Sequence, residues 1–253
     1  MRKFVHNKKS IILLAALILV LSVFGVSRHL GPNQSVQAIK AMSWVAAGRT
    51  IIVDPGHGGE DPGKVSPAGI YEKNINLAVG KKLYAVLNDS GAQVVMTREE
   101  DKALSQGEDT IRLRKRADLL NRMELAREHR ADLYIALHCN SFPQSRWKGA
   151  QTFYAPSVAG SKELAEFIQV ELEAYLRNTQ RKPKSDTTSL IFKEAHLPIV
   201  NIEMGFLSNP EEEKLLQDPA YQDKIVWAIY SGVVRYLAEY GDSFRPAMKM
   251  MEK

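Results

Sequence analysis

Short apolar runs rich in β-branched residues alternate with longer segments of helical periodicity, and this alternation constrains the fold more than any other feature of the chain. Strands are expected at Thr50–Val53, Gln93–Thr97, Leu133–Leu137, Ala150–Tyr154 and Pro198–Ile202. Helices are expected at Asn74–Asn88, Ile111–His129, Ser161–Arg177 and Ala220–Tyr240. Strands separated by helices pair in a common sheet, so the pattern predicts an α/β fold. We expect a single domain with a twisted, largely parallel mixed sheet flanked by helices on both faces.

The N-terminal segment differs from the rest of the chain. Its first nine residues include four Lys or Arg residues, and an apolar run follows from Ile11 to Val26, interrupted only by Ser22 and Gly25. This order is typical of an export signal or an uncleaved membrane anchor. We favour an anchor, with Val36-Gln37-Ala38 as the candidate cleavage site under the other interpretation. Both interpretations place the remainder of the protein outside the cytoplasm.

The formal net charge of +5 belongs to this leading segment. The first 38 residues contain five basic residues and no acid, which leaves equal numbers of basic and acidic residues in the remainder. A balanced domain has no overall attraction for phosphates, so no nucleic-acid partner is expected. The single cysteine, Cys139, permits no internal disulfide, and a domain of this size needs none outside the cytoplasm.

Three of the expected strands lead directly into residues that bind metals or transfer protons. Thr50–Val53 is followed by Asp54-Pro55-Gly56-His57, Leu133–Leu137 by His138, and Pro198–Ile202 by Glu203. Ligands of open α/β sheets bind outside the carboxyl ends of the strands, where residues distant in sequence converge. Glu72, expected just before the first helix, can face the same edge.

Two histidines and a carboxylate form a set that binds zinc and leaves one position for water. We assign His57, Glu72 and His138 as zinc ligands and Glu203 as the general base. Taken singly, each histidine is more often a hydrogen-bonding loop residue, and Glu72 is more often a solvated residue at a helix start. Glu203 differs, because a carboxylate at the end of so apolar a strand is costly to bury without a partner.

Two further residues are weaker candidates. Cys139 could bind zinc, but a small apolar filler beside the site is the preferred interpretation. His196 is interpreted as a loop histidine near the site rather than a ligand.

Five ordered motifs extend over most of the chain. They are DPGHGGEDPG at Asp54–Gly63, EKN-x-N-L at Glu72–Leu77, TREED at Thr97–Asp101, ADLYIALHCNS at Ala131–Ser141 and NIEMGFLSNPEEEKLL at Asn201–Leu216. In this order they resemble the zinc-dependent N-acetylmuramoyl-L-alanine amidases of cell-wall autolysins. The resemblance implies that His57, Glu72 and His138 bind Zn²⁺ and that Glu203 is catalytic. Arg98 and Arg122 also match family positions, where the resemblance implies structural or supporting roles.

A narrower resemblance links the chain to the germination-specific, spore-cortex members of this family. It rests on Lys148–Tyr154, Asn178–Lys184 and Pro219–Leu237. It implies a role in forming muramic-δ-lactam in the spore cortex, in functional partnership with a separate polysaccharide deacetylase. Arg127, where the family suggests Asn, and a longer connection at Lys64–Ala68 depart from the pattern, and neither is expected to touch the metal set.

The resemblance divides the chain into three parts. Residues 1–38 are a signal or membrane-anchor segment with its linker, residues 49–240 a zinc amidase catalytic domain, and residues 241–253 a C-terminal tail. The expected enzyme is a hydrolase of non-peptide carbon–nitrogen bonds that cuts peptidoglycan between the lactyl group of N-acetylmuramic acid and L-alanine. It would face the cell wall or spore cortex, either secreted or anchored to the membrane. The alternatives are a zinc peptidase that cuts within the stem peptide and a catalytically silent wall-binding protein.

Overall fold

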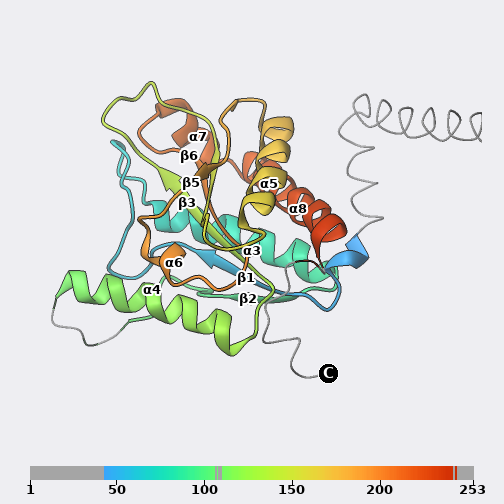
Figure 1. Ribbon diagram of the computed structural model, residues 1–253. Helices are drawn as coiled ribbons and strands as arrows, with labels where there is room; N and C mark the ends of the chain where they lie inside the picture. Colours follow the sequence, from blue (N-terminus) through green and yellow to red (C-terminus); the bar gives the residue numbers. More distant parts are fainter. Residues whose placement is uncertain (1–42, 106, 108–109, 242, 244–253) are drawn as a thin grey trace, which may run out of the picture. The chain divides into compact units, whose positions relative to one another are not determined.

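The computed structural model describes residues 43–105, 107, 110–241 and 243, which contain the whole predicted catalytic domain except residues 106, 108 and 109 (Figure 1). The predicted leader and most of the predicted tail lie outside these residues. The strands are β1 Thr50–Pro55, β2 Gln93–Met96, β3 Leu133–Asn140, β4 Gln151–Tyr154, β5 Lys184–Ser185 and β6 Ile199–Phe206. The helices are η1 Ser43–Ala46, α3 Glu72–Asp89, α4 Ile111–Glu128, α5 Ser161–Leu176, α6 Leu190–Lys193, α7 Pro210–Gln217 and α8 Pro219–Tyr240.

The strands form one sheet in the order β2-β1-β3-β6-β4-β5. Strands β2, β1, β3 and β6 run parallel to one another, β4 runs antiparallel to β6, and β5 runs parallel to β4. The prediction of a single α/β domain with a largely parallel mixed sheet is therefore confirmed. Because β1, β3 and β6 are parallel neighbours, their carboxyl ends lie together at one edge.

The alternation of side chains along each strand supplies a hydrophobic layer on both faces of the sheet. On one face Ile52 and Tyr134 pack with Met123 of α4 and Phe192 of α6 in a buried cluster. Residues on either side of Ile52 are also fully buried, and they point to the opposite face, where α3 contacts β1 and β3. Helix α8 packs against α3 and α5 in the same layer (Figure 1). Helices cover both faces, as predicted.

Two central strands are longer than expected, and this changes where the site residues lie. The apolar patterns end at Leu137 and Ile202, but backbone pairing continues to Asn140 in β3 and Phe206 in β6. His138 and Glu203 are therefore within strands and not in the loops after them. A polar side chain ends the hydrophobic pattern without ending the ladder, because the hydrogen bonds of the ladder belong to the backbone. Glu72, similarly, is the first residue of α3 rather than a residue before it.

Some elements were not predicted, namely η1, β5, α6 and α7. The start of helix α7 could have been predicted from the sequence. Asn209 caps it by accepting hydrogen bonds from the amides of Glu211 and Glu212, and Pro210 occupies the first turn. An Asn-Pro pair followed by acidic residues favours a helix start. Within the described residues, no helix combines the length and apolarity that a membrane span requires.

Candidate active site

Three predicted metal ligands converge at the carboxyl edge of the parallel strands. His57 follows β1, Glu72 begins α3 and His138 lies near the end of β3. Glu72 Oε1 lies 3.3 Å from His57 Nε2 and 3.0 Å from His138 Nδ1, and one potential ligand atom from each residue lies within 4.8 Å of the others. The two imidazole rings are nearly perpendicular, with centroids 4.9 Å apart. Such a set can hold one metal ion.

The loop that carries His57 has a strained backbone. His57 has a φ of 65°, in the left-handed region that residues with a side chain rarely adopt. Arg122 donates a hydrogen bond of 2.8 Å to the His57 carbonyl, and Arg98 donates to the carbonyls of Pro55 and Gly56 at 2.8 and 3.1 Å. These contacts hold the loop in a conformation that directs the imidazole toward Glu72.

The two arginines are themselves held in a buried network. Both Arg98 and Arg122 are 1% exposed. Arg122 forms an ion pair with Asp54, whose carboxylate also accepts hydrogen bonds from Thr97 and Tyr134 at 2.6 and 2.8 Å. Burial alone would raise the pKa of Asp54, but the charge on Arg122 and the hydrogen bonds lower it below its ordinary value. The expected supporting roles of Arg98 and Arg122 thus correspond to specific contacts with the loop.

Two glycines allow the predicted metal ligands to approach one another. A methyl group at Gly56 would lie 2.2 Å from the nearest atom of the His138 ring. A methyl group at Gly63 would lie 2.6 Å from both Glu72 and His57. Neither position can accept a side chain without displacing a ligand. Glycine at positions 56 and 63 is thus explained by the close approach of these three side chains.

Asp61 orients the first histidine. Its Oδ2 lies 2.7 Å from His57 Nδ1, which leaves Nε2 directed at Glu72. Burial alone would lower the pKa of His57, but Asp61 and Glu72 outweigh this effect and raise the pKa to about 9. A carboxylate behind a ligating histidine fixes the ring and increases its basicity as a ligand. Sequence reasoning missed Asp61, although it stands four residues after His57 within the first motif.

Glu72 is held in its charged form, as a metal ligand would need to be. Its side chain is 1% exposed, and it accepts hydrogen bonds from the backbone amides of Lys64 at 2.7 Å and Cys139 at 2.9 Å. Burial alone would raise the pKa of Glu72, but His138 and His57 hold it well below its usual range. The Lys64 contact corrects one expectation, because the longer connection at Lys64–Ala68 does touch the metal set through this amide. The sequence shows the length of a connection but not where its backbone donors point.

Glu203 lies beside the three ligands and has an unusual environment. It is directly paired in register with His138 between β3 and β6. Its Oε1 accepts a hydrogen bond of 3.3 Å from Asn201, while the buried Oε2 makes no hydrogen bond with any residue the structure describes. Burial raises the pKa of Glu203, and the nearby His138 only partly opposes this. A partly desolvated carboxyl group with a free oxygen is suited to accept and return a proton.

The weaker candidates occupy other places. Cys139 is buried; its amide donates to Glu72, and burial raises the pKa of its thiol well above the ordinary value. His196 is exposed in the connection between α6 and β6, outside the ligand set. Arg127, the other departure from the family pattern, donates to Glu124 of its own helix and to the carbonyl of Glu194, which links α4 to that connection.

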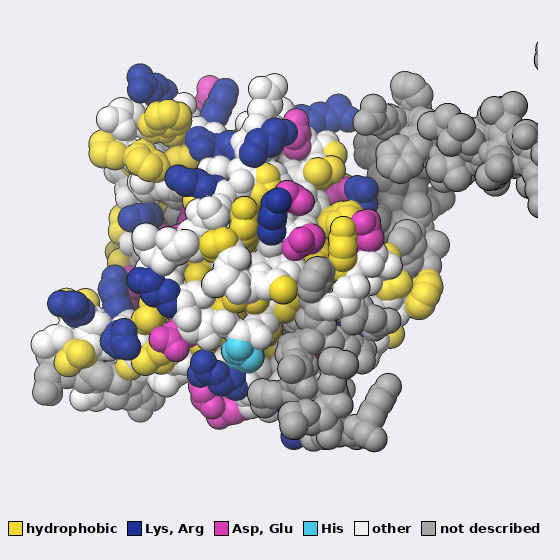
Figure 2. All heavy atoms as spheres, viewed as in Figure 1, with side chains coloured by type: hydrophobic (Ala, Val, Ile, Leu, Met, Phe, Trp, Pro, Cys, Tyr) yellow, Lys and Arg dark blue, Asp and Glu magenta, His cyan; other side chains and the backbone are white. Residues whose placement is uncertain are grey.

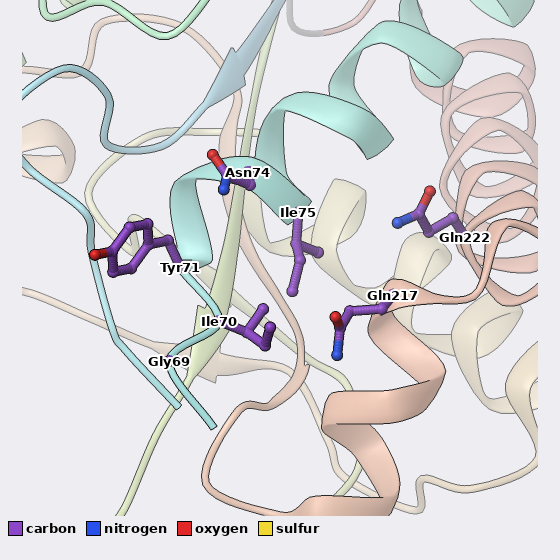
Figure 3. Close-up of a pocket in the computed structure, with 7 residues that line it drawn as sticks. All are labelled: Gly69, Ile70, Tyr71, Asn74, Ile75, Gln217 and Gln222. Atoms are coloured by element: carbon purple, nitrogen blue, oxygen red, sulfur yellow. The ribbon is translucent and has the colours of Figure 1, made fainter. Parts of the chain in front are cut away.

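A groove of about 480 Å³ opens next to the first turn of α3. Figure 3 shows its lining, which is formed by Gly69, Ile70, Tyr71, Asn74, Ile75, Gln217 and Gln222. No charged side chain lines it, and its lining residue Tyr71 directly precedes the predicted ligand Glu72.

Comparison with known proteins identifies the family. The family model described as N-acetylmuramoyl-L-alanine amidase matches residues 51–235, which include the ligand set and Glu203. The chain belongs to the N-acetylmuramoyl-L-alanine amidase family. The predicted membership is therefore confirmed, and the amidase can be compared with individual relatives.

Curated relatives and solved structures agree with this assignment. The amidase is 41% identical over 204 residues to the germination-specific N-acetylmuramoyl-L-alanine amidase of Bacillus subtilis, covering 80% of this chain and 86% of the relative. Its fold matches the CwlD amidase of Clostridioides difficile, solved in complex with the GerS lipoprotein, with a TM-score of 0.73 and 42% identity over 76% of this chain and 99% of that one. The catalytic domain of CwlV from Bacillus (Paenibacillus) polymyxa gives a TM-score of 0.66 and 29% identity over 75% and 98% of the two chains.

Proposed function

We propose that the amidase hydrolyses the bond between the N-acetylmuramoyl lactyl group and L-alanine by zinc-assisted attack of water, with Glu203 as acid and base. The observation that carries this proposal is the free, buried Oε2 of Glu203 beside three convergent ligands. Family membership supports the reaction and peptidoglycan as the substrate.

The residues present fit a zinc ion. Two imidazoles and one carboxylate are the donor set of catalytic zinc sites that keep an open position. The glycines at positions 56 and 63 leave space for the ligands to close around an ion, and Asp61 holds His57 as carboxylates hold metal-bound histidines elsewhere. His57, Glu72 and His138 would hold the zinc, which when bound lowers the pKa of water and polarises the scissile carbonyl.

The proton transfers are assigned to Glu203. Its carboxylate takes a proton from the attacking water as the oxygen of that water bonds to the lactyl carbonyl carbon. The protonated Glu203 then donates this proton to the nitrogen of L-alanine as the carbon–nitrogen bond breaks. The products are a lactyl carboxylate on the glycan and a peptide with a free amino terminus. A raised pKa favours this role, because the group must hold the proton between the two steps.

Digestion of purified peptidoglycan, followed by mass spectrometry, tests the reaction. We expect glycan freed of stem peptides, peptides that begin at L-alanine, and loss of activity on chelation. The Glu203→Gln variant, which keeps all three ligands, is the matched control. Cuts inside the peptide would replace the proposal with a zinc endopeptidase. No cleavage by a zinc-loaded chain would favour the silent wall-binding protein.

A role in spore-cortex modification is the narrower proposal. It is supported by the 41% sequence identity between this chain and the germination-specific amidase of Bacillus subtilis. The amidase would remove stem peptides so that a separate polysaccharide deacetylase can permit closure of muramic-δ-lactam. The related CwlD amidase was solved with a lipoprotein and not with a deacetylase, so the deacetylase is proposed as a partner in the reaction sequence and not as a binding partner. Muramic-δ-lactam in spores of a deletion strain measures the outcome: its persistence would refute the role.

We also propose that the amidase faces the wall from outside the cytoplasm, with residues 1–38 as a signal or anchor, residues 49–240 as the catalytic domain and residues 241–253 as a tail. The basic, acid-free start and the apolar run support this division. The N-terminal sequence and membrane fractionation of the protein purified from cells distinguish a cleaved signal from an anchor.

A further inference from the structure

Two arginines are held against an aromatic cluster on the surface that follows β3. The guanidinium of Arg181 lies 4.8 Å from the ring centre of Phe206 and 5.8 Å from that of Trp147, and the guanidinium of Arg146 lies 5.4 Å from the Trp147 ring. Phe142 completes the cluster, 6.1 Å from Phe206 and 6.3 Å from Trp147. We call these five residues the aromatic–arginine surface. Figure 2 shows hydrophobic side chains bordered by Lys and Arg where Figure 1 draws the loop after β3.

This surface adjoins the proposed catalytic base. Gln151 of β4 is directly paired with Glu203 of β6, and residues directly opposite on antiparallel strands point to the same face of the sheet. Arg181 donates a hydrogen bond of 3.3 Å to the side-chain oxygen of Gln151. Phe142 stands four residues after the ligand His138, and its amide donates to Ser208 beyond the end of β6. Arg181 therefore lies one side chain away from Glu203 along the sheet, and Arg146 is linked to it through Trp147.

No described carboxylate forms an ion pair with the two arginines of this surface, although the charge of the buried Glu212 acts on Arg181 from a longer distance. Lys182 forms an ion pair with Glu173 at 3.6 Å, but neither Arg146 nor Arg181 has a carboxylate of a described residue within ion-pair distance. Arg181 uses Nε for the Lys148 carbonyl and Nη1 for Gln151, which leaves Nη2 without a hydrogen bond to a described residue. The contacts with aromatic rings restrict both guanidinium groups before an anion binds, so less entropy is lost on binding.

The chemistry of the substrate identifies the anion. In the intact glycan–peptide the lactyl carboxyl is tied up in the scissile amide, and N-acetylated sugars carry no charge. The free carboxylates therefore belong to the stem peptide, the leaving group of the proposed reaction. Arginine pairs with carboxylates through two parallel hydrogen bonds, and such pairs give orientation as well as energy.

We propose that the aromatic–arginine surface is a subsite for the stem-peptide carboxylates beside the amide that is cut. This inference rests on the proposed function, since it takes the stem peptide as leaving group. It makes Arg181 and Arg146 specificity-determining residues that bind substrate and take no part in proton transfer.

Kinetics with two matched substrates test the subsite. One is a muramyl peptide with free carboxylates, and the other is the same molecule with those carboxylates amidated. For Arg181→Met we expect KM for the free acid to rise about tenfold or more with little change in kcat, and KM for the amidated substrate to change little. Arg146→Met should shift KM in the same direction, and because this exposed side chain makes no hydrogen bond with a described residue, its loss should not affect folding.

Lys162→Met is the control for loss of one positive charge. Lys162 is the second residue of α5. Its neighbour Ser161 accepts a hydrogen bond from the amide of Ile199, which places this end of α5 beside the amino end of β6. Lys162 lies at the edge of the sheet opposite to Glu203. An equal rise of KM in this variant, or an equal rise for the amidated substrate in Arg181→Met, would overturn the subsite.

Binding separates failure of the subsite from failure of the proposed function. In the full chain carrying Glu203→Gln, calorimetry with the two muramyl peptides should show tighter binding of the free acid, and adding Arg181→Met should abolish this preference. Loss of preference supports the subsite even if the parent cleaves neither substrate, which would refute the proposed reaction alone. An unchanged preference in the double variant overturns the subsite, whatever the parent cleaves.

Discussion

His138 and Glu203 are directly paired across the parallel strands β3 and β6. One side chain belongs to the ligand set and the other is the proposed base, so the ladder between two strands sets their spacing. The backbone of each residue is fixed by hydrogen bonds at the centre of the sheet. The relative position of His138 and the proposed base is therefore a property of the sheet and not of a loop.

Replacing the base should separate catalysis from metal binding. Glu203→Gln keeps the size of the side chain and all three ligands but removes the proton acceptor. We expect kcat to fall by about 10²–10⁴-fold, with the zinc content unchanged by elemental analysis. If the variant also loses zinc, Glu203 is a ligand and the role assigned to it is wrong.

Replacing a predicted ligand should abolish both metal binding and catalysis. His138→Ala removes one of three donors, so we expect loss of bound zinc and of hydrolysis together. His196→Ala is the matched control, because His196 is exposed and lies outside the ligand set. Full zinc occupancy in His138→Ala would show that the ligand set is wrong.

The carboxylate behind His57 should tune metal affinity. Asp61→Asn weakens the contact with His57 Nδ1 without touching the ligand atoms, and loss of such partners typically lowers metal affinity by about 10–100-fold. Competition with a chromophoric chelator measures this change. Glu60→Gln is the control, since Glu60 is exposed and pairs only with Arg114 among the described residues. Equal affinity in Asp61→Asn and the parent would remove Asp61 from the site.

The buried pair of Asp54 and Arg122 should contribute to stability in a pH-dependent manner. Asp54→Asn leaves the Arg122 charge without its main buried partner, and removing one member of a buried pair typically costs about 3–5 kcal/mol of unfolding free energy. The pKa of Asp54 is lower in the folded protein than its ordinary value of 3.8. Its stabilising contribution is therefore fully present above that value and is lost as the pH falls through the folded pKa.

Denaturant unfolding of the parent and the variant at several pH values checks this expectation. The difference in unfolding free energy should be constant near neutral pH and should shrink as the pH falls below 3.8. A difference that instead grows on acidification would contradict the assigned direction of the pKa shift.

The sequence alone was sufficient for the fold class and for the residues expected to converge. Apolar strands that lead into His57, His138 and Glu203 placed these residues at one sheet edge, because parallel neighbours share their carboxyl ends. The ends of the strands could not be predicted as well, since backbone pairing continues through polar residues such as His138. The supporting contact from Asp61 depends on a left-handed turn at His57, which no periodicity reports.

Contacts between segments distant along the chain could not be predicted from the sequence either. The aromatic–arginine surface brings Trp147 together with Arg181 and Phe206, which belong to three different segments. Trp147 and Arg181 stand in connecting segments, whereas Phe206 is a buried residue at the end of β6. Their association follows from the antiparallel pairing of β4 with β6, and the pattern of the chain gave no signal for that reversal.

The wide separation of the ligands along the chain has a consequence for how the enzyme is supplied with metal. Glu72 meets His138 only after β3 has paired with β1 and α3 has docked on the sheet. The complete set of three donors therefore exists only in the folded chain, so we expect full metal affinity to follow folding. A chain exported unfolded would then collect its zinc on the far side of the membrane, where the free metal concentration and not the rate of synthesis would set the amount of active enzyme.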